Sequence, residues 1–370
     1  MAVVAVTGAG GFIGSNLVVQ LREQGMTVVP IPHDNDVAAL QSLLGPADAV
    51  VHLAGVNRPV DETEFATGNA GMTERLVTAV AAMGRPLPIL YASSIQAALD
   101  NPYGRSKRDA ELALEAYGRS SGAPIAIFRL PNVFGKWCRP NYNSVVATFC
   151  SNIAHGRPIG ISDPARRLRL VYVDDVVARI IVVLRDPAAA GARPEVTPVY
   201  EISLGELAEQ LERFRDSRQT LVTGAVGTGL LRALHATYLS YLDPADFAYP
   251  LTAHTDQRGS FVEMLRTPDA GQFSYFTARP GITRGGHYHH SKTEKFLVLH
   301  GAARFGFRHI LTDQTYELVT TAEEARVVET IPGWAHDITN IGDETMVVML
   351  WANETFDRDH PDTVAARVVR

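Results

Sequence analysis

The sequence predicts two domains, an α/β domain built on a doubly wound parallel sheet and, after it, an all-β barrel. A chain of 370 residues is too long for one ordinary domain. Up to about residue 180, short apolar runs alternate with amphipathic helical stretches, as in right-handed βαβ units. From Phe261 onward, short runs rich in Val, Phe, Tyr and Thr alternate with turns. We place the boundary near residue 245, which gives domains at 1–245 and 246–370.

In the first domain, the spacing of apolar residues predicts where the helices and strands lie. Helical stretches are predicted at 64–82 and 106–117, and residues 181–243 are expected to be mainly helical, with one apolar stripe. Each predicted strand is a run of four or five mostly apolar residues, as in parallel strands that are covered on both faces. The five predicted strands are Val3–Val6, Thr27–Ile31, Ala49–Leu53, Ile89–Ala92 and Ile125–Arg129.

Composition excludes several functional classes. The formal net charge is −6 and the Lys and Arg residues are scattered, so we expect neither nucleic-acid nor membrane binding. Two cysteines, Cys138 and Cys150, give no disulfide framework. The apolar run 2–6 stops at a glycine-rich turn, which indicates a buried strand and not a signal peptide. No apolar stretch approaches the roughly 20 residues that span a bilayer. A cytoplasmic protein is expected.

A glycine-rich turn follows the first predicted strand. Gly8 permits the tight turn, Gly11 lets the backbone approach a pyrophosphate, and Gly14 allows close helix packing. Phe12 and Ile13 open the helix whose N-terminus would face the phosphates. A strand, a glycine turn and a helix in this order predict binding of a dinucleotide.

A Tyr and a Lys four positions apart predict a proton-transfer site. Tyr103 and Lys107 share one face of a helix, so the ammonium is expected to lower the pKa of the phenol. Ser94 would then hydrogen-bond a substrate carbonyl while Tyr103 supplies it with a proton. The neighbouring Ser93 is an alternative to Ser94.

The second domain carries two histidine-containing motifs. His287 and His289 alternate along a predicted strand and would therefore point to the same inward face. Glu294 is expected from the adjoining strand after a turn, and His336 from a strand across the barrel. Three imidazoles and a carboxylate predict a site for a divalent metal.

Several segments of the first domain together resemble the extended short-chain dehydrogenase/reductase family over residues 1–240. The resemblance implies that Leu53, Ala54, Gly55 and Asn69 bind the cofactor with Tyr103 and Lys107. It also implies that Asn132 and Arg169 contact a sugar nucleotide. Only nine positions separate Ser94 from Tyr103, which is shorter than the family's usual loop. The segments are Gly8–Gly14, His52–Gly55, Asn69–Gly71, Tyr103–Lys107, Arg129–Gly135 and Arg169–Asp175.

The choice of nicotinamide cofactor depends on the end of the second strand. An acid there would favour NAD through the ribose hydroxyls, but Asp34 comes a little late, and His33 is placed to face a 2′-phosphate. We expect NADPH, because a reductive role is implied, with NADH remaining open.

The motifs of the second domain resemble the cupin superfamily, which implies zinc in preference to iron or manganese. Cupins vary in which member of the first histidine pair coordinates the metal, so His287 is the least secure of the four ligand assignments. The segment Asp256–Glu263 resembles the opening of sugar-nucleotide 3,5-epimerase cupins. That likeness implies that Arg258, which is able to bind a phosphate, and Glu263 contact the substrate.

Taken end to end, the chain resembles the bifunctional capsular-polysaccharide enzymes of the CapF/WbjC family. The resemblance implies C3 epimerisation of a UDP-2-acetamido-2,6-dideoxy-4-hexulose in the cupin, followed by NADPH-dependent reduction of the 4-ketone. The product would be UDP-N-acetyl-6-deoxy-L-talosamine, on the route to UDP-N-acetyl-L-fucosamine, and the enzyme would be a homodimer. Two alternatives remain: a single-activity reductase whose cupin only dimerises and covers the site, and a non-catalytic nucleotide sensor.

Overall fold

The chain forms two compact units in the computed structural model. The structure describes residues 2–33, 35–256, 259–262, 264–265, 267, 271–354 and 359–369. One unit comprises Met1–Ser144 and Arg167–Ile202, and the other comprises Val145–Arg166 and Ser203–Arg370. The helices expected at the end of the first domain therefore pack with the barrel, and the boundary near residue 245 marks where helices give way to strands.

The first unit is built on a five-stranded sheet in the order β2-β1-β3-β4-β5, in which every pair is parallel. This confirms the predicted doubly wound α/β fold, and each strand lies within two residues of its predicted bounds. The order reverses between β1 and β3, and ligands of such sheets bind at the carboxyl ends of the strands where this happens. The strands are β1 (Val3–Thr7), β2 (Thr27–Ile31), β3 (Ala49–His52), β4 (Ile89–Ser94) and β5 (Ile125–Leu130).

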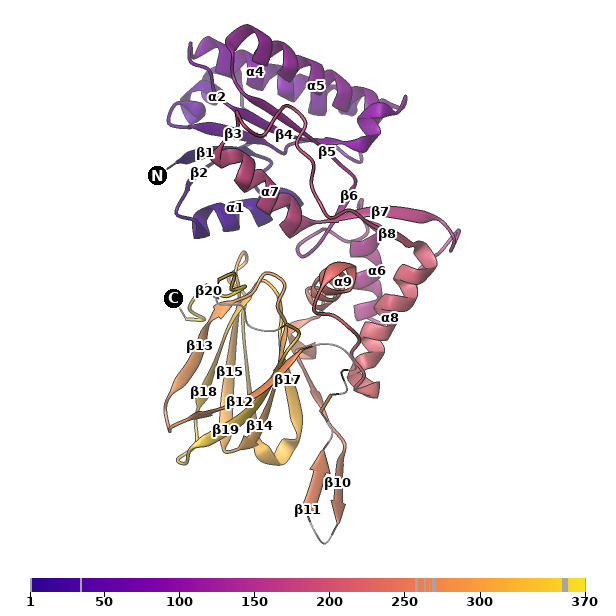
Figure 1. Ribbon diagram of the computed structural model, residues 1–370, viewed down its shortest axis with the longest axis vertical. Helices are drawn as coiled ribbons and strands as arrows, with labels where there is room; N and C mark the ends of the chain where they lie inside the picture. The colour runs from indigo at the N-terminus through magenta and orange to yellow at the C-terminus, as the bar shows by residue number, and fades with distance from the viewer. Residues whose placement is uncertain are drawn as a thin grey trace. The chain divides into compact units, whose positions relative to one another are not determined.

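Helices cover both faces of this sheet (Figure 1). The long helix α5 begins where the Asn101 side chain accepts a hydrogen bond from the Gly104 N–H at 2.7 Å, and it ends at Gly122, whose φ is +73°. On one face lie α2 (Val37–Leu44), α4 (Met72–Ala82) and α5 (Pro102–Ser121), and on the other lie α1 (Phe12–Glu23) and α7 (Val173–Arg185). Two short helices, α3 (Thr63–Phe65) and η1 (Ala66–Gly71), precede α4, and a small sheet of β6 (Asn132–Phe134), β7 (Arg167–Tyr172) and β8 (Tyr200–Ser203) completes the unit.

The second unit contains a barrel of two five-stranded antiparallel sheets, which confirms the predicted cupin-like fold (Figure 1). Large side chains from both sheets, among them Phe305, Phe307 and Trp351, fill its interior. The first sheet has the order β12 (Gln272–Ala278), β19 (Met346–Ala352), β14 (Glu294–His300), β17 (Arg326–Thr330), β9 (Ala248–Pro250). The second has the order β16 (Thr315–Thr321), β15 (Ala302–His309), β18 (Trp334–Asn340), β13 (Thr283–Tyr288), β20 (Val364–Ala365). Separately, β10 (Ala253–Asp256) pairs antiparallel with β11 (Gly259–Val262).

Three helices pack in the same unit: α6 (Val145–Ala154), α8 (Leu204–Thr220) and α9 (Gly229–Leu239). The predicted apolar stripe of α8 is buried, and Ser203 begins the helix with a capping box to Glu206. Within the part of the chain that the structure describes, no helix combines the length and the apolar character needed to cross a membrane.

A buried ionic cluster ties α8 to the barrel. Glu329 on β17 accepts from Arg218 of α8 at 2.6 Å and from Lys295 of β14, and its side chain is only 3% exposed. Lys295 also donates to the Tyr249 hydroxyl at 3.0 Å. Burial by itself raises the pKa of Glu329, but the charges of Lys295 and Arg218 outweigh it and lower that pKa to about 2.

Replacing Glu329 with Gln should destabilise the barrel unit by about 3–5 kcal/mol at pH 7, because two buried cations lose their counter-charge. The folded-state pKa is depressed, so this stabilisation is present above the unfolded glutamate pKa of about 4.3 and is lost as the pH falls toward 2. Urea unfolding followed by tryptophan fluorescence at pH 7 and pH 4 should show the gap to wild type narrowing in acid. The exposed Glu317→Gln is the matched control, and a gap independent of pH would contradict the prediction.

Candidate active site and metal centre

The glycine-rich turn lies at the carboxyl end of β1, where the strand order reverses. Gly8 has φ +66°, and its carbonyl accepts a hydrogen bond from the Gly11 N–H at 2.9 Å. A Cβ on Gly14 would lie 2.0 Å from that carbonyl oxygen, so only glycine allows helix α1, which starts at Phe12 and Ile13, to pack this closely. A cleft of about 380 Å³ opens beside the turn, lined by Gly8, Ala9, Gly10, Pro30, Ile31, Pro32, His33, Ala54 and Gly55.

A buried hydrogen-bond chain holds the loop after β3 against this turn. The Thr7 hydroxyl accepts from the Leu53 and Ala54 N–H groups, each at 3.1 Å, and lies 2.6 Å from His52 Nδ1. His52 Nε2 lies 2.9 Å from the hydroxyl of Thr73, which donates to the Asn69 carbonyl. Burial, with the charge of Lys107 adding to it, lowers the pKa of His52 to about 3, so the ring is neutral.

Asn69 connects the same loop to helix α5. Its side-chain oxygen accepts from the Val56 N–H at 2.9 Å, and its amide donates to Ser106 Oγ at 3.0 Å. A Cβ on Gly55 would lie 2.7 Å from the Asn69 oxygen and 3.1 Å from Lys107 Nζ. The structure thus brings together the loop residues, Asn69 and Lys107, which sequence reasoning had taken from separate segments.

Ser94, Tyr103 and Lys107 come together at the ends of β4 and α5. The Ser94 and Tyr103 side chains are hydrogen-bonded, and burial raises the pKa of Tyr103 against the opposing effect of that bond. Burial also lowers the pKa of Lys107 to about 8, and its ammonium donates to the Ala92 carbonyl at 3.2 Å. The phenol pKa is thus shifted in the direction opposite to the lowering that was expected from Lys107, whose charge is not among the causes of the shift.

Ser93 and Ser94 have different partners. The Ser93 hydroxyl donates to Glu111 at 2.5 Å, and Glu111 also accepts from Arg129 and Arg193 at 2.6 and 2.8 Å. Burial raises the pKa of Glu111, but these three donors together lower it. Ser93 is thus engaged away from Tyr103, and the geometry favours Ser94. Sequence reasoning missed Glu111, although its position one turn beyond Lys107 on the same helix face was a usable signal.

The two substrate residues predicted in the first unit are neighbours. Asn132 on β6 donates to the Arg169 carbonyl on β7 at 3.4 Å, and the Arg169 side chain lies 3.9 Å from Glu201. Both Asn132 and Arg169 have exposed side chains. The other predicted substrate residues, Arg258 and Glu263, lie outside the described residues, as does Asp34.

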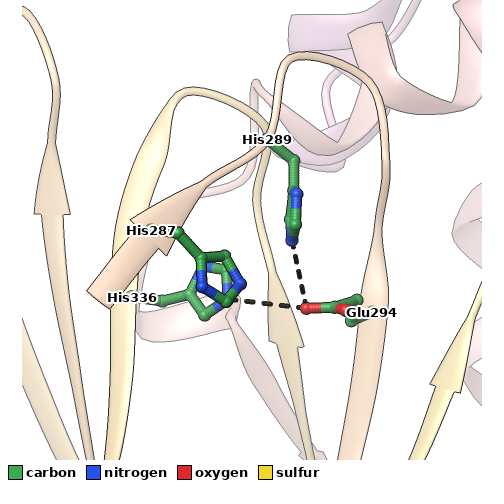
Figure 2. A group of neighbouring side chains, drawn as sticks. All are labelled: His287, His289, Glu294 and His336. Atoms are coloured by element: carbon green, nitrogen blue, oxygen red, sulfur yellow. Dashed lines mark hydrogen bonds and ion pairs between the residues drawn. The ribbon is translucent and has the colours of Figure 1, made fainter. Parts of the chain in front are cut away.

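His287, His289, Glu294 and His336 converge inside the barrel (Figure 2). One ligand atom from each lies within 4.8 Å of all the others. Glu294 Oε2 is 3.2 Å from His289 Nε2 and 3.4 Å from His336 Nε2. His287 is partly exposed, whereas the other three residues are buried.

The strands that supply these four residues differ from the expected ones. His336 on β18 is the register partner of His287 on the adjacent β13, so it does not come from across the barrel. Glu294 begins β14, which belongs to the opposite sheet, and His289 lies one residue beyond the end of β13. The turn between β13 and β14 crosses from one sheet to the other, a step that spacing along the chain does not reveal.

The side chains of this cluster fit a divalent cation. Neither ring nitrogen of the buried His336 meets hydrogen-bond geometry with any described residue. Burial raises the pKa of Glu294, but its hydrogen bond with His289 and its close contact with His336 hold that pKa well below its usual range. Burial lowers the pKa of His287 to about 4, with the neighbouring histidines adding to the effect. An ionised carboxylate beside three imidazoles is a suitable ligand set for zinc.

Both units are similar to known proteins. Residues 4–202 match the NAD dependent epimerase/dehydratase family, and residues 254–364 match the polysaccharide biosynthesis C-terminal domain. A UDP-2-acetamido-2,6-beta-L-arabino-hexul-4-ose reductase of Pseudomonas aeruginosa is 56% identical over 99% of this chain and 98% of its own. The capsular polysaccharide assembling protein CapF of Staphylococcus aureus superposes with a TM-score of 0.68 at 41% identity, covering 98% and 99% of the two chains. A UDP-glucuronic acid 4-epimerase of Bacillus cereus shares the fold alone, at 22% identity, a TM-score of 0.52, and coverage of 58% and 83%.

Proposed function

The chain belongs to the CapF family of capsular-polysaccharide enzymes, and from this membership we propose that it carries out two consecutive steps on one UDP-linked keto sugar. The barrel would epimerise C3 of a UDP-2-acetamido-2,6-dideoxy-4-hexulose. The α/β unit would then reduce the C4 ketone with NADPH to give UDP-N-acetyl-6-deoxy-L-talosamine. The two steps fit together chemically, because the ketone that acidifies the C3 proton is the group that is later reduced.

The reductive step is supported by one observation above the others, the hydrogen bond between Ser94 and Tyr103 beside the glycine-lined cleft. Bound NADPH supplies the hydride. Tyr103 would give its hydroxyl proton to the ketone oxygen as negative charge develops there, and Ser94 would hold that oxygen in line. Lys107, with its pKa near 8, is mostly protonated at neutral pH and would stabilise the phenolate that remains.

The epimerisation step is supported by the cluster in the barrel. His287, His289, Glu294 and His336 would hold the metal, which as a Lewis acid is able to stabilise an enolate. A general base would take the C3 proton and leave the enolate, and a general acid would then give a proton to the opposite face of C3 to form the epimer. Both groups would exchange their protons with water. Lys292 lies at the edge of the cluster, with its ammonium 3.0 Å from Glu294 Oε1, and it contributes a positive charge where an anionic intermediate would form.

The experiment that tests this function follows two readouts on the wild-type protein with the UDP-4-keto sugar in heavy water. We expect deuterium to enter C3 without any cofactor, and NADPH to be oxidised when it is added, faster than NADH. Oxidation of NADPH without C3 exchange would leave a single-activity reductase with a structural barrel. Absence of both activities with this and related sugars would favour a nucleotide-sensing protein.

A further inference from the structure

The imidazole of His289 is oriented from outside its own strand. His289 lies one residue beyond β13, and its Nδ1 contacts the backbone carbonyl of Asp362, while its Nε2 faces the cluster. A carbonyl oxygen only accepts hydrogen bonds, so Nδ1 carries a hydrogen, and Nε2 is the ring nitrogen that is left to face a cation in the cluster. Outer contacts of this kind fix the tautomer and the direction of a metal-bound histidine.

The side chain of the same residue holds the turn between two of the clustered residues. Asp362 Oδ1 accepts from the His290 N–H at 2.7 Å, and Oδ2 accepts from the N–H groups of Ser291 and Lys292, each at 2.7 Å. The Ser291 hydroxyl adds a fourth hydrogen bond at 3.0 Å. One carboxylate thus fixes the backbone of the three residues that follow His289 and lead to Glu294.

The segment that carries Asp362 is itself anchored to the barrel. Strand β20 pairs with β13, with Val364 opposite Tyr288 and Ala365 opposite His287. The Ala366 N–H donates to the Gly286 carbonyl at 2.9 Å, and Val368 is 4% exposed. The segment that follows Asp362 is therefore paired with the strand that supplies His287. This pairing fixes the position of Asp362 relative to the cluster.

We propose that Asp362 is a positioning residue for the metal centre, acting through the direction of the His289 ring and the path of residues 290–292. This inference rests on the metal site of the proposed function. Asp362 is not one of the four residues that converge in the cluster, so its effect would be indirect. Its loss should leave all four ligands present but misaligned, and changes to such outer contacts typically weaken metal affinity by about 10–100-fold.

The test uses the full-length chain, stripped with a chelator and titrated with Co²⁺, whose d–d absorption reports coordination. Asp362→Asn places an amide NH₂ against backbone N–H donors, so we expect Co²⁺ binding about 10–100-fold weaker than in wild type. Ser291→Ala removes one of the four hydrogen bonds and should give a smaller loss, and Asp343→Asn, at an exposed site, should bind like wild type.

Thermal melts of the stripped and loaded proteins separate positioning from simple destabilisation. A ligand that binds only the folded state raises the melting temperature in proportion to the logarithm of its affinity. If Asp362 positions His289, the rise on adding Co²⁺ shrinks in Asp362→Asn. If both melts fall by the same amount and affinity is unchanged, Asp362 is only structural and the inference is wrong. Should Asp362→Asn not fold, wild-type affinity in Ser291→Ala overturns it. If the wild-type protein does not bind Co²⁺, the metal site of the proposed function is itself wrong.

Discussion

Tyr103→Phe should lower NADPH-dependent reduction of the 4-keto sugar by about 10²–10⁴-fold, whereas deuterium exchange at C3 continues at the wild-type rate. The phenylalanine keeps the aromatic ring, whose centroid lies 5.6 Å from the ring centroid of Phe65. Only the hydroxyl that is hydrogen-bonded to Ser94 is removed. NADPH oxidation is measured by absorbance and C3 exchange by mass spectrometry or NMR. The loss should appear in kcat, because the missing proton donor acts in the transition state.

The matched control for this variant is Tyr275→Phe, which removes an exposed phenol from the barrel. It should retain both activities. If Tyr103→Phe also abolishes exchange at C3, the two reactions do not belong to separate sites, and the division of labour proposed for the two units fails. If it reduces the sugar at the wild-type rate, another group supplies the proton.

His336→Ala should show the converse pattern, loss of C3 exchange with an intact reductase site. It removes one of the four converging side chains, which is only 5% exposed, and the cluster has no fifth member among the described residues. Three-ligand sites of this kind bind metal more weakly, so we expect the metal content per chain, measured by atomic emission, to fall well below one.

Reduction in this variant is best assayed on sugar that the wild-type enzyme has already equilibrated at C3, so that a block in the first step does not hide the second. His300→Ala replaces an exposed histidine paired with Glu344, and it should keep full metal content and exchange. Undiminished C3 exchange in His336→Ala would contradict a role for the cluster in epimerisation. Full metal content with lost exchange would assign His336 to the chemistry and not to metal binding.

Much of the first unit was predictable because its signals are local. The glycine turn, the strand runs and the Tyr103–Lys107 pair each lie within a short stretch whose spacing follows from backbone geometry. The choice between Ser93 and Ser94 was not predictable, because it depends on Glu111 and on arginines from two other segments. The direction of the Tyr103 pKa shift also depended on burial, which no local pattern measures.

The four-residue cluster in the barrel was also predictable only in part. Its members were identified from motif spacing, but their strands were not, since the turn 290–293 crosses between sheets and places His336 beside His287. Asp362 lies 73 positions from His289 and carries no motif, so only the folded chain reveals its contact.

The sequence by itself determined the two fold classes, the order of the elements and which residues were candidates for the two sites, because strand and helix periods and glycine turns are properties of neighbouring residues. Tertiary structure decided which serine faces Tyr103, which sheet supplies each clustered side chain, and which distant groups orient them. Those outcomes depend on desolvation and on hydrogen bonds between segments far apart in the chain, and both exist only once the chain has packed.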